Sequence, residues 1–123
     1  MLHYYNSDIK NLLPQNMKDA LERYFGNGEY GVSEVLLDWK TNDVTLVTID
    51  KVEIIQYQRA ETWTHYANID YGRKDGYWEL NSQFKGANHD EMWIYGHFKK
   101  FGDAVRSLAT KGIDNRKPID VYR

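Results

Sequence analysis

The sequence contains no cysteine. This absence excludes a disulfide framework, a thiolate nucleophile and a zinc site built on cysteine ligands. A chain without cysteine is compatible with a reducing compartment, and we expect a cytoplasmic protein.

Long hydrophobic runs are also lacking. No apolar stretch approaches the roughly 18 residues that a membrane-spanning helix needs. The first eight residues have neither the basic nor the apolar segment of a secretory signal peptide. We therefore expect no contact with a membrane.

Neither sign of charge dominates, because 16 basic and 18 acidic residues leave a formal net charge of −2. Strong binding to duplex nucleic acid relies on counterion release by many Lys and Arg side chains. The balance therefore disfavours a protein whose main task is to hold a duplex, although it leaves room for a local basic patch.

Motifs for metal or cofactor binding are absent as well. The four histidines are His3, His65, His89 and His97, and no two of them have the i, i+4 spacing of a helical zinc site. The glycines at positions 26–31 match neither a phosphate-binding loop nor a dinucleotide fingerprint. We predict no metal and no cofactor.

A strand that runs directly into a helix is the clearest local pattern. Residues 92–98 are rich in the aromatic and β-branched side chains that favour a strand. Phe101, Val105 and Leu108 then recur at i, i+4 and i+7, which indicates a helix with one apolar face. Gly112 can end that helix, because glycine readily takes a positive φ. Such a helix needs a sheet beneath it.

A second helix is predicted near the N-terminus. Pro14 suits its start, and Met17, Leu21 and Phe25 form an apolar stripe that ends at the glycines of residues 26–28.

Between the two helices the apolar residues alternate with a period of two, which predicts strands. The expected strands cover residues 29–39, 44–49, 52–57, 62–71 and 77–84, with Asp50-Lys51 as a tight turn. The same alternation places Trp39 on a strand face with Leu37, and Trp63 and His65 on a face with Ala67, Ile69 and Tyr71.

Short turns between successive strands indicate antiparallel neighbours. We therefore predict a single α+β domain over residues 1–123. It has an N-terminal helix, a curved, meander-like antiparallel sheet of about five to six strands, and a C-terminal helix packed on the sheet.

Aromatic residues are abundant, at 15% of the chain. One core beneath two helices does not need all four tryptophans together with the strand tyrosines, so we expect exposed rings on the sheet face away from the helices. The favoured hypothesis is a small non-catalytic module that binds a protein partner, as an inhibitor or accessory protein, or a second copy of itself. The expected binding residues are Trp63, Tyr71, Trp78, Trp93 and Tyr95.

Basic side chains beside the strand aromatics favour an alternative hypothesis, the binding of single-stranded nucleic acid. Bases would stack on the exposed rings while cations meet the phosphates. The cations expected to do so are Arg59, Arg73, Lys74, Lys99 and Lys100.

A third hypothesis is an enzyme, which we consider less favoured than a binding module. His65 and His97 both lie in the middle of predicted strands. In a cone-shaped sheet they would face one pocket as general bases, with Asp70 or Glu79 as the orienting carboxylate.

Overall fold

The computed structural model describes residues 1–55, 60–72, 75–85, 90–113 and 118–119. Its elements are β1 (Leu2–Tyr4), α1 (Ser7–Leu12), α2 (Gln15–Phe25), β2 (Tyr30–Leu37), β3 (Val44–Ile55), β4 (Ala60–Gly72), β5 (Tyr77–Lys85), β6 (Asp90–Phe98), α3 (Phe101–Lys111) and β7 (Pro118–Ile119). The strands form one sheet in the order of the sequence, in which β1 runs parallel to β2 and all other neighbours are antiparallel. The predicted α+β architecture is confirmed: β2 to β6 form the meander, and β1 and β7 are short edge strands.

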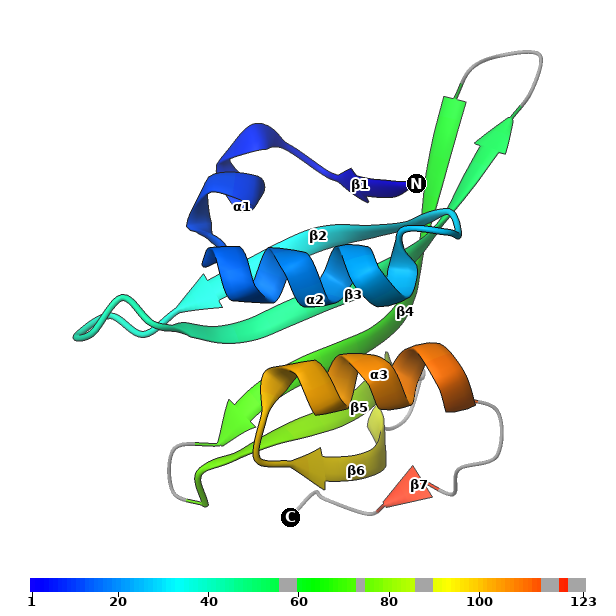
Figure 1. Cartoon of the computed structure of the whole chain (residues 1–123). Helices are drawn as coiled ribbons and strands as arrows, with labels where there is room; N and C mark the ends of the chain where they lie inside the picture. The colour runs from blue at the N-terminus through cyan, green and yellow to red at the C-terminus, as the bar shows by residue number, and fades with distance from the viewer. Residues whose placement is uncertain (56–59, 73–74, 86–89, 114–117, 120–123) are drawn as a thin grey trace.

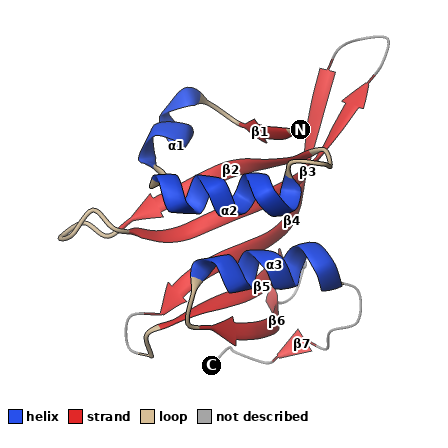
Figure 2. Ribbon diagram, viewed as in Figure 1, coloured by secondary structure: helices blue, strands red, loops and turns tan. Residues whose placement is uncertain are grey.

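Helices α2 and α3 lie side by side over one face of the sheet, and both begin at the end of the domain where the β2–β3 loop projects (Figure 1, Figure 2). Their apolar stripes meet the sheet in a single core. The larger fully buried apolar side chains are Phe25, Leu21, Ile49, Ile69, Leu80, Leu108, Val32, Val47 and Val105. Within the described ranges, no helix has both the length and the apolar character needed to cross a bilayer.

The predicted end of α3 is also confirmed. Gly112 has a φ of 67°, a conformation that favours glycine, and its N–H donates to the carbonyl oxygen of Leu108 at 2.9 Å. Ile113 then packs against the core, as a residue that follows such a cap commonly does.

The predicted turn at Asp50-Lys51 is wrong, because β3 runs without a break through both residues. Each polar side chain has a partner on a neighbouring strand. The Asp50 carboxylate lies 3.5 Å from the His65 imidazole, and the Lys51 ammonium lies 4.9 Å from the centre of the Tyr66 ring. Contacts with a neighbouring strand thus keep Asp50 and Lys51 inside β3, although both residue types are common in turns. A pattern within the segment itself gives no information about such contacts.

The prediction that Trp63, His65, Ala67, Ile69 and Tyr71 share one face of a strand is wrong for Trp63 and His65. Ala67 pairs with Ile49 and His65 pairs with Asp50, so Tyr66 is an extra residue in β4. Such a β-bulge reverses the alternation on one side of it. Ile49 and Ala67 face the core under the helices, whereas Asp50 and the His65 that contacts it lie on the opposite face, which we call the open face.

Candidate functional site

Three of the five predicted binding rings pack against the core under the helices. Trp78 is only 8% exposed, and its ring centre lies 5.1 Å from that of Phe101 in α3 and 5.0 Å from that of Tyr71. Tyr71 and Tyr95 pack against the same core, and the Tyr95 hydroxyl lies 2.6 Å from the Ser82 hydroxyl. These three rings are therefore part of the packing of the domain and do not form an exposed binding surface.

Of the other two predicted rings, Trp93 also lies on the helix side, because it pairs with Ser82, two residues along β5 from the buried Leu80. Trp63 lies on the open face, where its edge-to-face partner is Tyr5 with 5.9 Å between ring centres. Trp93 is half-buried, and its indole nitrogen is buried. The structure therefore does not bring the five predicted rings onto one exposed face.

A different tryptophan is presented to solvent. Trp39 is 82% exposed and lies just beyond the end of β2, in the β2–β3 loop. The prediction that it shares a strand face with Leu37 is wrong, because β2 ends at Leu37. Lys40 lies over the indole ring, with its ammonium 5.0 Å from the ring centre. We call residues 38–43 the Trp39 loop.

Asp38 determines the shape of the Trp39 loop. Its side-chain Oδ1 accepts hydrogen bonds from the N–H groups of Lys40 (2.7 Å) and Thr41 (2.9 Å). Its own N–H donates to the carbonyl oxygen of Asp43, and its carbonyl oxygen accepts from the N–H of Asn42, both at 2.8 Å. Asn42 has a positive φ of 61°, which asparagine tolerates better than most residues. The loop is therefore held in one shape by its own hydrogen bonds.

A cavity of about 550 Å³ opens beside the Trp39 loop. Its walls come from Pro14, which directly precedes α2, and Met17 of α2, from the loop (Asp38 and Asp43) and from the sheet (Tyr71 and Trp78). An adjoining cavity of about 330 Å³ shares Asp38 and Tyr71 with the first and is also lined by Trp39 and Asp70. We call the two adjoining cavities the loop groove.

The loop groove is acidic. Its described lining residues include Asp38, Asp43 and Asp70 but no Lys, Arg or His. Burial, and to a smaller extent the negative charge of Glu79, raises the pKa of the Asp70 carboxyl above its usual range. The groove thus combines apolar and aromatic walls with carboxylates.

His97 ends a polar network that crosses four strands on the open face. Thr48 donates to Asn68 (3.0 Å), Asn68 donates to Asn81 (3.3 Å), and Asn81 donates to the Glu79 carboxylate (2.9 Å). The other Glu79 oxygen lies 3.1 Å from the His97 imidazole. The network fixes the orientation of Glu79, and through it that of His97.

The cleft beside this pair is small. It has a volume of about 80 Å³ and is lined by Asp70, Tyr77, Glu79 and His97, among others. Small-molecule sites usually exceed about 300 Å³. His65 does not line this cleft and contacts Asp50 instead, so each imidazole has its own carboxylate. The structure does not bring His65 and His97 together, although both lie on the open face.

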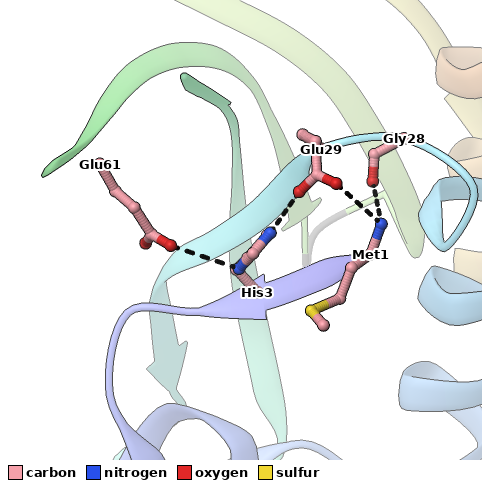
Figure 3. Close-up of polar contacts among 5 residues, drawn as sticks. All are labelled: Met1, His3, Gly28, Glu29 and Glu61. Atoms are coloured by element: carbon pink, nitrogen blue, oxygen red, sulfur yellow. Dashed lines mark hydrogen bonds and ion pairs between the residues drawn. The ribbon is translucent and has the colours of Figure 1, made fainter. Parts of the chain in front are cut away.

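A third imidazole–carboxylate contact lies at the edge of the sheet, where His3 of β1 sits between two glutamates (Figure 3). Its Nε2 is 2.5 Å from Glu29 and its Nδ1 is 3.8 Å from Glu61 of β4. The hydrogen bond with His3 is the main cause that lowers the pKa of the Glu29 carboxyl. The Met1 amino group donates to the Gly28 carbonyl oxygen at 2.6 Å. These contacts tie the short strand β1 to its neighbours.

The residues predicted for the nucleic-acid alternative are only partly described. Lys99 and Lys100 are exposed at the junction between β6 and α3. Arg59, Arg73 and Lys74 lie outside the described residues. For the described part of the chain, no group of three or more His, Asp or Glu side chains is arranged to hold a metal ion.

The alternating pattern does not identify Trp39 as exposed, because it continues to residue 39, whereas β2 ends at Leu37. The available signal was its position directly before Lys40-Thr41-Asn42-Asp43, a typical turn composition. A side chain in a hairpin loop lies beyond the ends of both strands and is therefore not covered by them.

The chain matches no model of a known protein family, no curated protein and no solved structure. Function therefore has to be derived from the geometry of the site itself.

Proposed function

We propose that this protein is a small, non-catalytic, cytoplasmic module that binds a protein partner through the Trp39 loop and the loop groove, as an inhibitor or accessory protein. The observation that carries the proposal is the 82% exposure of Trp39, which lines the smaller of the two cavities of the loop groove. Tryptophan is enriched among the few residues that dominate binding energy at protein interfaces, because its large ring buries much area with few torsions to order.

The hydrogen bonds of Asp38 support this proposal. Ordering a mobile loop on binding costs conformational entropy, which lowers affinity. The Trp39 loop already has a defined shape, with two backbone N–H groups bound to the Asp38 carboxylate. A pre-shaped loop with an exposed ring next to a groove has the features of a binding surface that changes little when its partner arrives.

The test is affinity capture from a lysate of the source, using the wild-type chain, Trp39→Ala and Tyr5→Ala, each treated with nuclease. Tyr5 is a matched control because it is also an exposed aromatic residue, at 64%, and contacts Trp63 rather than the loop groove. We expect one protein to be captured by the wild-type chain and by Tyr5→Ala, and lost with Trp39→Ala. Equal capture by all three chains would refute the proposal.

Two other partners give different results in the same experiment. A homodimer predicts twice the mass of one chain in light scattering, reduced to one mass by Trp39→Ala. Single-stranded nucleic acid predicts capture that nuclease abolishes and that weakens steeply with salt. Either result would replace the protein partner proposed above.

A further inference from the structure

We propose that Asn27 is a site of spontaneous modification, at which deamidation through the Gly28 nitrogen produces an isoaspartyl residue that loosens the attachment of β1. The site lies in the turn after α2, whereas the loop groove is lined by Pro14, which precedes that helix. The modification is therefore separate from the binding surface of the proposed function.

Asn27 is the one asparagine of the sequence that is followed by glycine. Because glycine has no Cβ atom, the nitrogen of Gly28 can approach the Asn27 side chain with little steric hindrance. Asn27 lies beyond the end of α2 at Phe25, and its side chain is exposed and makes no hydrogen bond with another described residue. The side chain can therefore turn toward the nitrogen that follows it.

The packing around position 28 requires a glycine there. A Cβ atom on Gly28 would lie 2.7 Å from Cε2 of Tyr30, and the Tyr30 ring is itself packed on the rings of Phe25 and Tyr66. The Gly28 N–H donates to the carbonyl oxygen of Phe25 at 3.2 Å, which is at the long end of the range for such hydrogen bonds. A bond of this length opens readily and releases the nitrogen for attack.

The reaction consumes only water. The Gly28 nitrogen loses its proton and forms a bond with Cγ of Asn27, the Cγ–Nδ2 bond breaks, and the side-chain nitrogen leaves as ammonia. Water then opens the cyclic succinimide at either of its carbonyl groups. Opening at the former side-chain carbonyl gives aspartate. Opening at the main-chain carbonyl gives isoaspartate, in which the chain runs through Cβ and the α-carboxylate is free. No group is oxidised or reduced.

Isoaspartate adds one carbon to the main chain between two anchored residues. Phe25 is only 2% exposed in the core, and the Glu29 carbonyl oxygen accepts from the Val52 N–H of β3 at 2.9 Å. The turn between these anchors must therefore take up the extra atom. The Gly28 carbonyl oxygen in this turn accepts from the Met1 amino group at 2.6 Å, one of the contacts that tie β1 to its neighbours (Figure 3). We expect this contact to be lost in the isoaspartyl form.

The first experiment ages the purified chain at physiological temperature and maps its peptides by mass spectrometry, with electron-transfer fragmentation to distinguish isoaspartate from aspartate. We expect Asn27 to convert before any other asparagine. Conversion should be faster at mildly alkaline than at mildly acidic pH, because the attacking nitrogen must lose a proton.

Two asparagine positions serve as controls in this experiment. Asn42 is also exposed, but it is followed by Asp43, whose side chain hinders the approach of the nitrogen. Asn42 should therefore convert more slowly than Asn27. Asn27→Gln should remove the conversion at position 27, because the longer side chain does not close the same ring.

The second experiment compares hydrogen exchange of the β1 amides in aged wild type, fresh wild type, aged Asn27→Gln and fresh Asn27→Asp. Asn27→Asp adds the charge of the deamidated product without lengthening the main chain, so it separates the two effects of the modification. Exchange should be roughly tenfold faster in the isoaspartyl protein than in the other three, as expected when a hydrogen bond to a charged group is lost.

Each experiment has outcomes that would overturn the proposal. No conversion at Asn27, or earlier conversion at Asn42, would show that the turn does not permit the attack. Unchanged exchange of the β1 amides in the isoaspartyl protein, or equally fast exchange in fresh Asn27→Asp, would show that the added chain atom does not release β1.

Discussion

The indole ring of Trp63 in β4 lies directly on Gly31 of β2, two strands away. A Cβ atom on Gly31 would overlap Cζ3 and Cη2 of Trp63 and would lie 2.9 Å from the carbonyl oxygen of His3. Tyr5 packs on the indole edge-to-face. Trp63 therefore spans the open face from β4 to β2, and it reaches this position because residue 31 has no side chain.

The first prediction concerns this close approach. Gly31→Ala should destabilise the protein by about 1–3 kcal/mol, the usual cost of forcing an extra methyl group into a packed site. Unfolding in urea, followed by tryptophan fluorescence, measures the change. Gly102→Ala is the control, because a Cβ there meets nothing within 4 Å and lies in helix α3. It should leave stability unchanged or raise it by about 0.5 kcal/mol. Equal effects of both changes would show that Trp63 yields to the methyl group without cost.

The second prediction separates two tryptophans that the sequence does not distinguish. Trp78→Ala should cost about 3–5 kcal/mol, because the ring is buried between Tyr71 and Phe101. Trp39→Ala should change stability by less than about 0.5 kcal/mol, as is typical of exposed positions. Thermal melting of both variants measures this contrast. A large loss with Trp39→Ala would mean that its effect on partner capture reflects unfolding.

The third prediction concerns the pH dependence caused by Asp70. Its pKa is raised above the ordinary 3.8 in the folded state. At pH values between the unfolded-state and folded-state pKa, Asp70 is therefore protonated in the folded protein but mostly ionised in the unfolded chain. Stability must therefore fall as pH rises through the interval between those two pKa values. Asp70→Asn removes this loss and should stabilise the protein at pH 7 by roughly 0.5 kcal/mol, a small value because the carboxyl is partly exposed and screened. Urea unfolding at about pH 3.5 should show little difference from wild type, because both side chains are then neutral. An equal gain at both pH values would assign the effect to packing.

The fourth prediction concerns Glu29, which makes stability rise with pH, whereas Asp70 makes it fall. The pKa of Glu29 is lowered from the ordinary 4.5, chiefly by its hydrogen bond with His3. Its contribution to stability is therefore complete above pH 4.5 and is lost as pH falls through the folded-state pKa. Glu29→Gln should lose less stability than wild type between about pH 6 and pH 3. Hydrogen exchange of the β1 amides should follow the same trend, because His3 lies in that strand. Parallel pH profiles for the two proteins would show that the contact does not stabilise the fold.

Much of the fold follows from local patterns. The stripe of Leu21 and Phe25, the stripe of Phe101, Val105 and Leu108, and the stop at Gly112 predict both long helices, because their burial depends on residues within two or three turns. The prediction of a turn at Asp50-Lys51 is wrong, because contacts with His65 and Tyr66 on another strand keep both residues in β3.

The candidate site depends on information that is not local. The bulge at Tyr66 exists only relative to the partner strand β3, so no period within β4 reveals that His65 and Ala67 face opposite sides. Trp39 and Trp78 both lie in predicted strands, yet Trp39 is presented to solvent and Trp78 is buried against Phe101 of α3.

The amino-acid sequence by itself determined the class of this domain, its two long helices, its antiparallel meander and the absence of cysteine chemistry. The tertiary structure alone decided which rings are buried, where the strand faces reverse, and that Asp38, Asp43, Tyr71 and Trp78 line one groove. The physical reason is range: helix and strand periods arise from neighbours along the chain, whereas exposure and cavity shape arise from packing between segments far apart in it.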